Sequence, residues 1–165
     1  MTAQFAEWLR YEGKEVAMCT NPICDYFALA GFQPSFESNC TALWRGYVGQ
    51  WEIFDGRLYL VKLDGRLKEG TIASVATIFP DFPDRVFAHW YSGALRVPQG
   101  YLLKYKHMGY GSLYERDLLI KIARGVVQGF RVRHNGHIDH SDAPKGYVPG
   151  GFVTFPIGEG KGLDQ

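Results

Sequence analysis

The alternation of apolar and polar positions is clearest over residues 43–63, where two aromatic-rich runs flank the dipeptide Asp55-Gly56. This pattern predicts a β-hairpin, because Asp-Gly readily supplies the positive φ that a type I′ turn needs at both central positions. The second run is apolar on both alternating faces, one with Leu58 and Leu60 and the other with Tyr59, Val61 and Leu63. We therefore expect this run to be an inner strand that is covered on both sides.

Two further pairs of apolar runs predict hairpins elsewhere along the chain. Residues 8–17 are expected to turn at Glu12-Gly13. Residues 114–133 are compatible with a helix over 114–124, but two glycines and many β-branched side chains favour a hairpin that turns near Arg124-Gly125. The same type of turn therefore recurs at widely separated positions.

The segments between these hairpins carry weaker patterns. Residues 86–91 are typical of a strand that turns at Ser92-Gly93 into a short return strand, which the following proline ends. Residues 71–79 have the length of a buried helix, but their β-branched side chains favour a strand. Residues 18–40 lose periodicity and predict a long connection with one helical turn near Tyr26–Ala30.

Repeated short strands with glycine turns predict an all-β or β-dominated α+β fold. We expect antiparallel hairpins that form a sandwich or a partly open barrel, with at most one or two short helices. The 15% content of aromatic residues agrees with strands, and 165 residues suffice for one domain with its own core. We expect this domain over residues 1–135, including the connection at 18–40, and a Gly/Pro-rich extension over 136–165 that packs partly on it.

Charge is balanced over the whole chain but not along it. The formal net charge of +1 gives no global electrostatic case for nucleic-acid binding. Residues 104–133, however, hold seven Lys and Arg residues against two acidic residues, beside several tyrosines. A solvated strand face is the simplest interpretation, whereas an acidic protein, a phosphorylated ligand or single-stranded nucleic acid could use such charges. The candidate binding residues are Tyr105, Tyr110, Arg131 and Arg133.

The densest cluster of metal-ligating residue types lies just after the last predicted strand and comprises His134, His137, Asp139 and His140. Imidazole and carboxylate groups suit Zn²⁺, Fe²⁺ and other divalent ions. A divalent metal is therefore the one cofactor that the sequence raises, and no other cofactor is predicted. The spacing matches no established metal motif, so a polar exit from the strand is the simpler interpretation.

The cysteines Cys19, Cys24 and Cys40 are a second potential set of metal ligands. The spacing of the first two lies within the range of zinc sites, but a second pair is missing, and Cys40 is expected at the start of a strand as a buried thiol. The sequence shows neither a secretory signal pattern nor an apolar run long enough to cross a bilayer. We therefore expect a cytoplasmic protein with free thiols and no membrane partner.

Residues 107–115 hold the candidate catalytic side chains His107, Ser112 and Glu115, which could supply a base, a nucleophile and an orienting carboxylate. The serine lies in no nucleophile elbow, and the Gly-x-Gly around Tyr110 lacks the strand–helix context of a phosphate loop. A connection from a strand into a turn is the simpler interpretation of this segment.

No pattern in the chain marks a nucleotide-binding, hydrolase, kinase or redox family. The sequence therefore favours a small cytoplasmic protein-binding module that acts by surface recognition, such as an inhibitor, an immunity-type protein or a regulator, over an enzyme. One alternative is a small enzyme or ligand-binding β-barrel with a site near His107 and Tyr110 or a metal site at the histidine cluster. The other alternative is nucleic-acid binding through residues 104–133.

Overall fold

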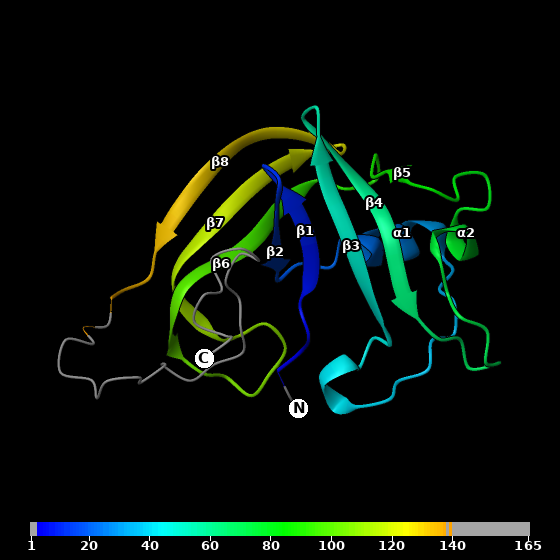
Figure 1. The fold of residues 1–165 in the computed structure, drawn as a ribbon, viewed down its shortest axis with the longest axis horizontal. Helices are drawn as coiled ribbons and strands as arrows, with labels where there is room; N and C mark the ends of the chain where they lie inside the picture. Colours follow the sequence, from blue (N-terminus) through cyan, green and yellow to red (C-terminus); the bar gives the residue numbers. More distant parts are fainter. Residues whose placement is uncertain (1–2, 138, 140–165) are drawn as a thin grey trace.

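The computed structural model of this chain describes residues 3–137 and residue 139, which form one mixed β-sheet of eight strands with two α-helices (Figure 1). The strands are β1 (Glu7–Tyr11), β2 (Lys14–Met18), β3 (Tyr47–Phe54), β4 (Arg57–Gly65), β5 (Val86–Phe87), β6 (Gly93–Lys104), β7 (Leu113–Ala123) and β8 (Val126–His134). The helices are α1 (Pro22–Ala30), α2 (Val75–Ile78) and a short 3-10 helix, η1 (Thr41–Leu43). The β-dominated class predicted from the sequence is confirmed.

The strands follow the order β2-β1-β3-β4-β8-β7-β6, and β5 pairs with β4 outside this path. Only β1 and β3 run parallel among these pairs, and β4 meets β8 at a single residue pair, Arg57 and Val126. The sheet is not closed into a barrel, although its two ends approach where the amide of Cys19 donates to the carbonyl of Arg96 at 2.8 Å. Figure 1 shows β6, β7 and β8 arching together on one side, with β3 and β4 on the other.

The three tight hairpins lie where the glycine turns predict them. Glu12-Gly13, Asp55-Gly56 and Arg124-Gly125 all have positive φ at both residues, between 47° and 80°. These turns connect β1 to β2, β3 to β4, and β7 to β8. Residues 114–133 therefore form the hairpin that the sequence favoured, and no helix.

The second arm of the central hairpin differs from strict alternation in one respect. The β3–β4 register pairs Gln50 with Lys62 and then Trp51 with Leu60, so β4 carries an extra residue at that point. Beyond this bulge the side chains change face. Leu63 is therefore buried on the same side as Leu58 and Leu60, and its prediction on the opposite face was wrong.

Two segments expected to be strands are not. Residues 75–78 form the short helix α2 instead of a strand, because Ser74 and Thr77 make a reciprocal capping box at its start. Cys40 is exposed at the start of η1 rather than buried in a strand.

The predicted hairpin around Ser92-Gly93 was also wrong. Only Val86–Phe87 of the first arm is a strand, and it pairs with β4 rather than with β6. The second arm is the long strand β6, which passes through Pro98 to Lys104. Because β6 is the last strand in the sheet order, the missing N–H of this proline need not disrupt a ladder on its outer side.

The connection at residues 18–40 contains nine helical residues, more than the single turn expected. Pro22 starts α1, where its fixed φ suits a helix, and Gly31 ends it in the left-handed conformation with a φ of 64°. No helix of the described residues is long and apolar enough to cross a membrane.

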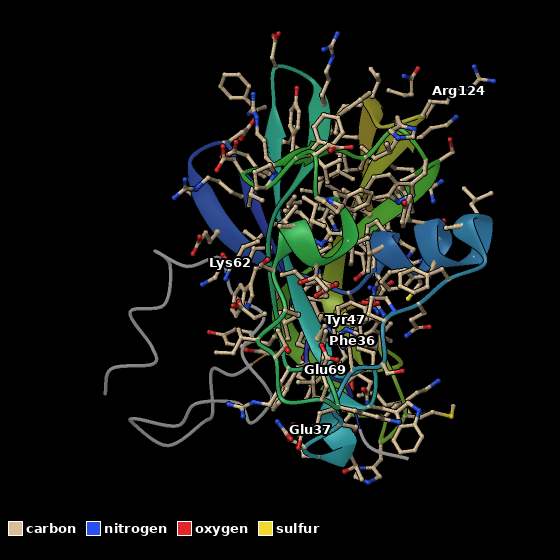
Figure 2. The ribbon with its side chains drawn as sticks, turned by 90° about the vertical axis from the view of Figure 1, so that its right-hand side faces the viewer. Phe36, Glu37, Tyr47, Lys62, Glu69 and Arg124 are labelled. Carbon is tan, nitrogen blue, oxygen red and sulfur yellow. The ribbon has the colours of Figure 1, made fainter. Side chains whose placement is uncertain are left out.

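Aromatic side chains from the helices and the sheet make one continuous core. Trp90 stacks on Phe79 at 5.3 Å between ring centroids and lies 6.5 Å from Trp51 of β3. Figure 2 shows Phe36 and Tyr47 together in the interior, where their ring centroids are 4.9 Å apart. The helices therefore share a single core with the sheet and do not form a separate unit.

Candidate functional site

The strand with the most exposed residues is β8, and we call its segment Gln128–His134 the β8 edge. Its residues pair with β7, whereas the only pair between β4 and β8 lies earlier, at Val126. Phe130 and Val132 are 51% and 44% exposed, although they lie on the same face as the buried core residues of β7. Figure 1 shows β8 at the outer border of the arch. This strand therefore offers both backbone groups and apolar side chains to a partner.

The two predicted arginines of the β8 edge have different surroundings. Arg131 is exposed and makes no ion pair with any residue that the structure describes. Arg133 donates to the Oδ2 of Asp117 at 2.7 Å. Because side chains alternate along a strand, both arginines lie on the face opposite Phe130 and Val132.

Asp117 of β7 is fully buried, and its carboxylate accepts hydrogen bonds from side chains of β6, of β8 and of the residue that follows β8. Arg96 of β6 donates to its Oδ1 at 2.9 Å, and Asn135 and Arg133 donate to its Oδ2 at 3.0 and 2.7 Å. Burial by itself would raise the pKa of this carboxyl group, but these hydrogen bonds lower it below its ordinary value. Of the seven basic residues in 104–133, Arg133 is therefore partly neutralised by a buried carboxylate of the fold.

The three candidate catalytic residues each bind a different neighbour. The Nδ1 of His107 lies 3.1 Å from the hydroxyl of Tyr105, and the Oγ of Ser112 accepts from the amide of Lys106 at 3.0 Å. Glu115 accepts from the amide of Tyr101 at 2.8 Å and lies 2.7 Å from the Nδ1 of His137. The Tyr101 amide is the main cause of the lowered pKa of Glu115. The structure does not join these residues into a nucleophile–base pair.

The structure describes three of the four predicted metal ligands, namely His134, His137 and Asp139. His134 ends β8, His137 contacts Glu115, and His140 lies outside the described residues. Within residues 3–137 and 139, no group of three or more His, Cys, Asp and Glu side chains is placed to hold a metal ion. All three cysteines are free thiols. The metal site that includes His140 stays a prediction.

Tyr105 and Tyr110 do come together, in a pocket of about 430 Å³ that we call the strap pocket. Residues 105–112, which connect β6 to β7, form a strap that lines the pocket together with residues of β1 and β2, and residues 3–6 line it from the N-terminal side. The hydroxyl of Tyr110 donates to the Oδ1 of Asn21 at 2.6 Å. This pocket includes part of the region around His107 and Tyr110 that the sequence raised as an alternative site.

A buried ionic pair was missed by the sequence reasoning. Glu7 accepts hydrogen bonds from the amide of Gly49 and from the Nη2 of Arg45, the latter at 3.2 Å. Burial raises the pKa of Glu7 to about 7, although the charge of Arg45 and the Gly49 amide oppose the shift. In the alternating run of β1, Glu7 occupies a position that faces the same way as the buried Leu9. That position was the one feature of the sequence that could have indicated a buried carboxyl group.

Comparison with known proteins does not assign a family. The chain matches no protein-family model, no curated protein and no solved structure. Because fold alone does not determine function, a functional assignment depends on the chemistry of the β8 edge and the strap pocket.

Proposed function

We propose that this protein is a recognition module that binds an extended, acidic segment of another protein along the β8 edge. The observation that carries the proposal is that, among the residues that the structure describes, Gln128–His134 pairs with β7 alone. An antiparallel strand with one neighbour leaves alternate backbone N–H and C=O groups free on its other side. Addition of a partner strand to such an edge is a recurrent mode of peptide recognition.

The side chains of the β8 edge support a partner with alternating acidic and apolar residues. Phe130 and Val132 offer exposed apolar surface on one face. Arg131 and Arg133 lie on the other face, and the exposed Lys121 lies beside them because it pairs with Gly129. A strand of matching alternation would place its acidic side chains beside the cations and its apolar side chains beside Phe130 and Val132.

The same charges disfavour a second copy of this chain as the partner. Antiparallel pairing of two β8 edges would bring the arginines of both copies to the same junction. Like charges across neighbouring strands are destabilising, and basic residues at sheet edges commonly protect proteins from such association. The arginines therefore favour an acidic peptide segment over a second β8 edge as the binding partner.

Nucleic acid is a less suitable partner for this surface. Arg96 and Arg133 both pair with Asp117, so their charges are partly neutralised. Non-specific nucleic-acid binding depends on several cations that replace the counterions of the phosphates. An acidic peptide that adds a strand to β8 needs fewer free cations than nucleic acid does, because the peptide backbone supplies additional hydrogen bonds.

A peptide titration tests the proposal. A short peptide of alternating Glu and Val, labelled for fluorescence anisotropy, should bind, and a peptide with Lys in place of Glu should not. Arg131→Glu should weaken binding roughly ten-fold, or about 1.4 kcal/mol, because it places like charges side by side. Lys68→Glu makes the same change of charge at an exposed position away from β8 and should leave binding unchanged.

Amide hydrogen exchange distinguishes strand addition from simple charge attraction. Bound peptide should slow exchange at alternate residues of the β8 edge, because those amides gain partners. Equal binding of the acidic and basic peptides, or unchanged exchange in β8, would contradict the proposal. Tighter binding of a single-stranded oligonucleotide, or dimerisation of the protein without peptide, would favour the other partners instead.

A further inference from the structure

We propose that the strap pocket is a separate binding site for a small, uncharged, mainly aromatic molecule. Its volume of about 430 Å³ lies within the range of small-molecule sites in proteins. None of the residues that line it belongs to β8. The site therefore adds a second activity to the proposed recognition of an acidic segment and does not depend on it.

The lining of the pocket comes from four separate parts of the chain, residues 3–8, 17–19, 48 and 105–114. The strands β1, β2 and β3 contribute Trp8, Ala17 and Val48 to the lining. The strap and the N-terminal segment also line the pocket. Five aromatic side chains line the pocket: Phe5, Trp8, Tyr105, Tyr110 and Tyr114. Such walls offer edge-to-face and stacking contacts to an aromatic ring.

Several polar groups of the pocket are already bound to the protein. The Tyr110 hydroxyl is bound to Asn21, and the Ser112 hydroxyl accepts from the backbone of the strap. The side chain of Gln4 donates to the carbonyl of Thr41 at 2.6 Å and accepts from the amide of Trp44 at 2.9 Å.

Among the described residues, the lining also lacks a counter-charge for an ionic ligand. No Lys, Arg, His, Asp or Glu of the described residues lines the pocket. Burial raises the pKa of the Cys19 thiol to about 11, so this lining side chain is also neutral near pH 7. An ion that entered would lose its water without finding an opposite charge, which makes an uncharged occupant the favourable one.

Part-buried hydrogen bonds hold the strap in place. Arg96 donates through its two terminal nitrogens to the carbonyls of Tyr110 and Ser112, at 2.6 and 2.8 Å. The N-terminal segment is tied to the strap where the amide of Gln4 donates to the carbonyl of Gly109 at 3.0 Å. A site held in this way needs little reorganisation when a ligand binds.

A pair of matched dyes tests both the site and the charge preference. N-phenyl-1-naphthylamine is uncharged and fluoresces in apolar surroundings, and 8-anilino-1-naphthalenesulfonate is its sulfonated counterpart. The full chain should bind the uncharged dye with saturation at one site, and the sulfonate at least about ten-fold more weakly, because none of the described residues that line the pocket is a cation. Equal affinity for both dyes, or binding that does not saturate, would overturn the proposal.

Two matched pairs of variants locate the dye. Val48→Phe should fill part of the pocket and weaken binding of the uncharged dye about ten-fold, whereas Val61→Phe makes the same exchange on β4, outside the lining. Phe5→Ala removes one wall and should also weaken binding, whereas Phe82→Ala truncates an exposed phenylalanine outside the lining. Far-ultraviolet circular dichroism checks that each variant folds.

The same experiment separates the strap pocket from the β8 edge. Phe130→Ala removes an exposed aromatic side chain of β8 and should leave dye binding unchanged. Loss of dye binding in Phe130→Ala with full binding in Val48→Phe would place the dye on β8 and overturn the proposal. Because the dye and the acidic peptide use different residues, failure of either site leaves the result for the other intact.

Discussion

The carboxyl group of Glu7 lies fully buried between β1 and β3, where it binds Arg45 and the amide of Gly49. Its pKa of about 7 means that the folded protein holds this proton more tightly than the unfolded chain, whose value is near 4.5. The stabilising effect of the proton is therefore complete below about pH 4.5 and is lost as the pH rises to about 7. The free energy of unfolding should fall by on the order of 3 kcal/mol between about pH 5 and pH 8, measured by urea titration.

Glu7→Gln should remove most of this fall, because the glutamine oxygen can still accept both hydrogen bonds but has no proton to lose. Glu37→Gln changes an exposed carboxylate and should keep the slope of the parent protein. Asp117 and Glu115 have lowered pKa values, so they reduce stability only at more acidic pH and do not mimic Glu7. An unchanged slope in Glu7→Gln would show that Glu7 is not the responsible group.

At the scale of elements, Asp117 joins three strands and, through Arg96, the strap that covers the sheet. Asp117→Asn should lower the free energy of unfolding by about 3 kcal/mol, because it leaves two arginines beside a neutral group in a buried site. Asp64→Asn removes one partner of an exposed pair with Lys62 and should cost less than about 1 kcal/mol. Chemical denaturation measures both values. Similar losses in the two variants would argue against a special role for Asp117.

The elements that could be predicted from the sequence are those whose chemistry is local. A turn such as Asp55-Gly56 needs positive φ at adjacent residues, and this requirement is visible in the dipeptide itself. The pairing of β5 with β4 is different, because nothing near Val86 indicates a partner more than twenty residues away. The side of Leu63 was also unpredictable, since it depends on a bulge between two strands.

The same distinction applies to the candidate sites. Arg131 and Arg133 could be predicted as surface charges from the local pattern, but the pairing of Arg133 with Asp117 depends on the register of two strands. Glu7 and Arg45 are far apart in sequence and meet only because β1 lies parallel to β3. The strap pocket combines residues from both halves of the chain. Of its lining, only Tyr105, Tyr110, Ser112 and Cys19 were indicated in advance, and they were indicated for separate roles.

At the scale of the whole molecule, Trp90 connects the helices to the sheet. Its indole nitrogen donates to the carbonyl of Pro22 in α1 at 2.9 Å, and its ring packs on Phe79 after α2 and near Trp51 of β3. Trp90→Ala should therefore lower the free energy of unfolding by about 3 kcal/mol, the low end for loss of a large aromatic side chain because Trp90 is only half-buried.

Trp44→Ala is the matched control, because Trp44 is 75% exposed and its loss should cost less than about 1 kcal/mol. Since both helices pack on the same core as the sheet, unfolding of Trp90→Ala followed by tryptophan fluorescence should coincide with unfolding followed by circular dichroism. Two separate transitions in this variant would mean that the helices and the sheet fold as independent units. A single shifted transition would show that Trp90 stabilises one cooperative core, on which both the β8 edge and the strap pocket are built.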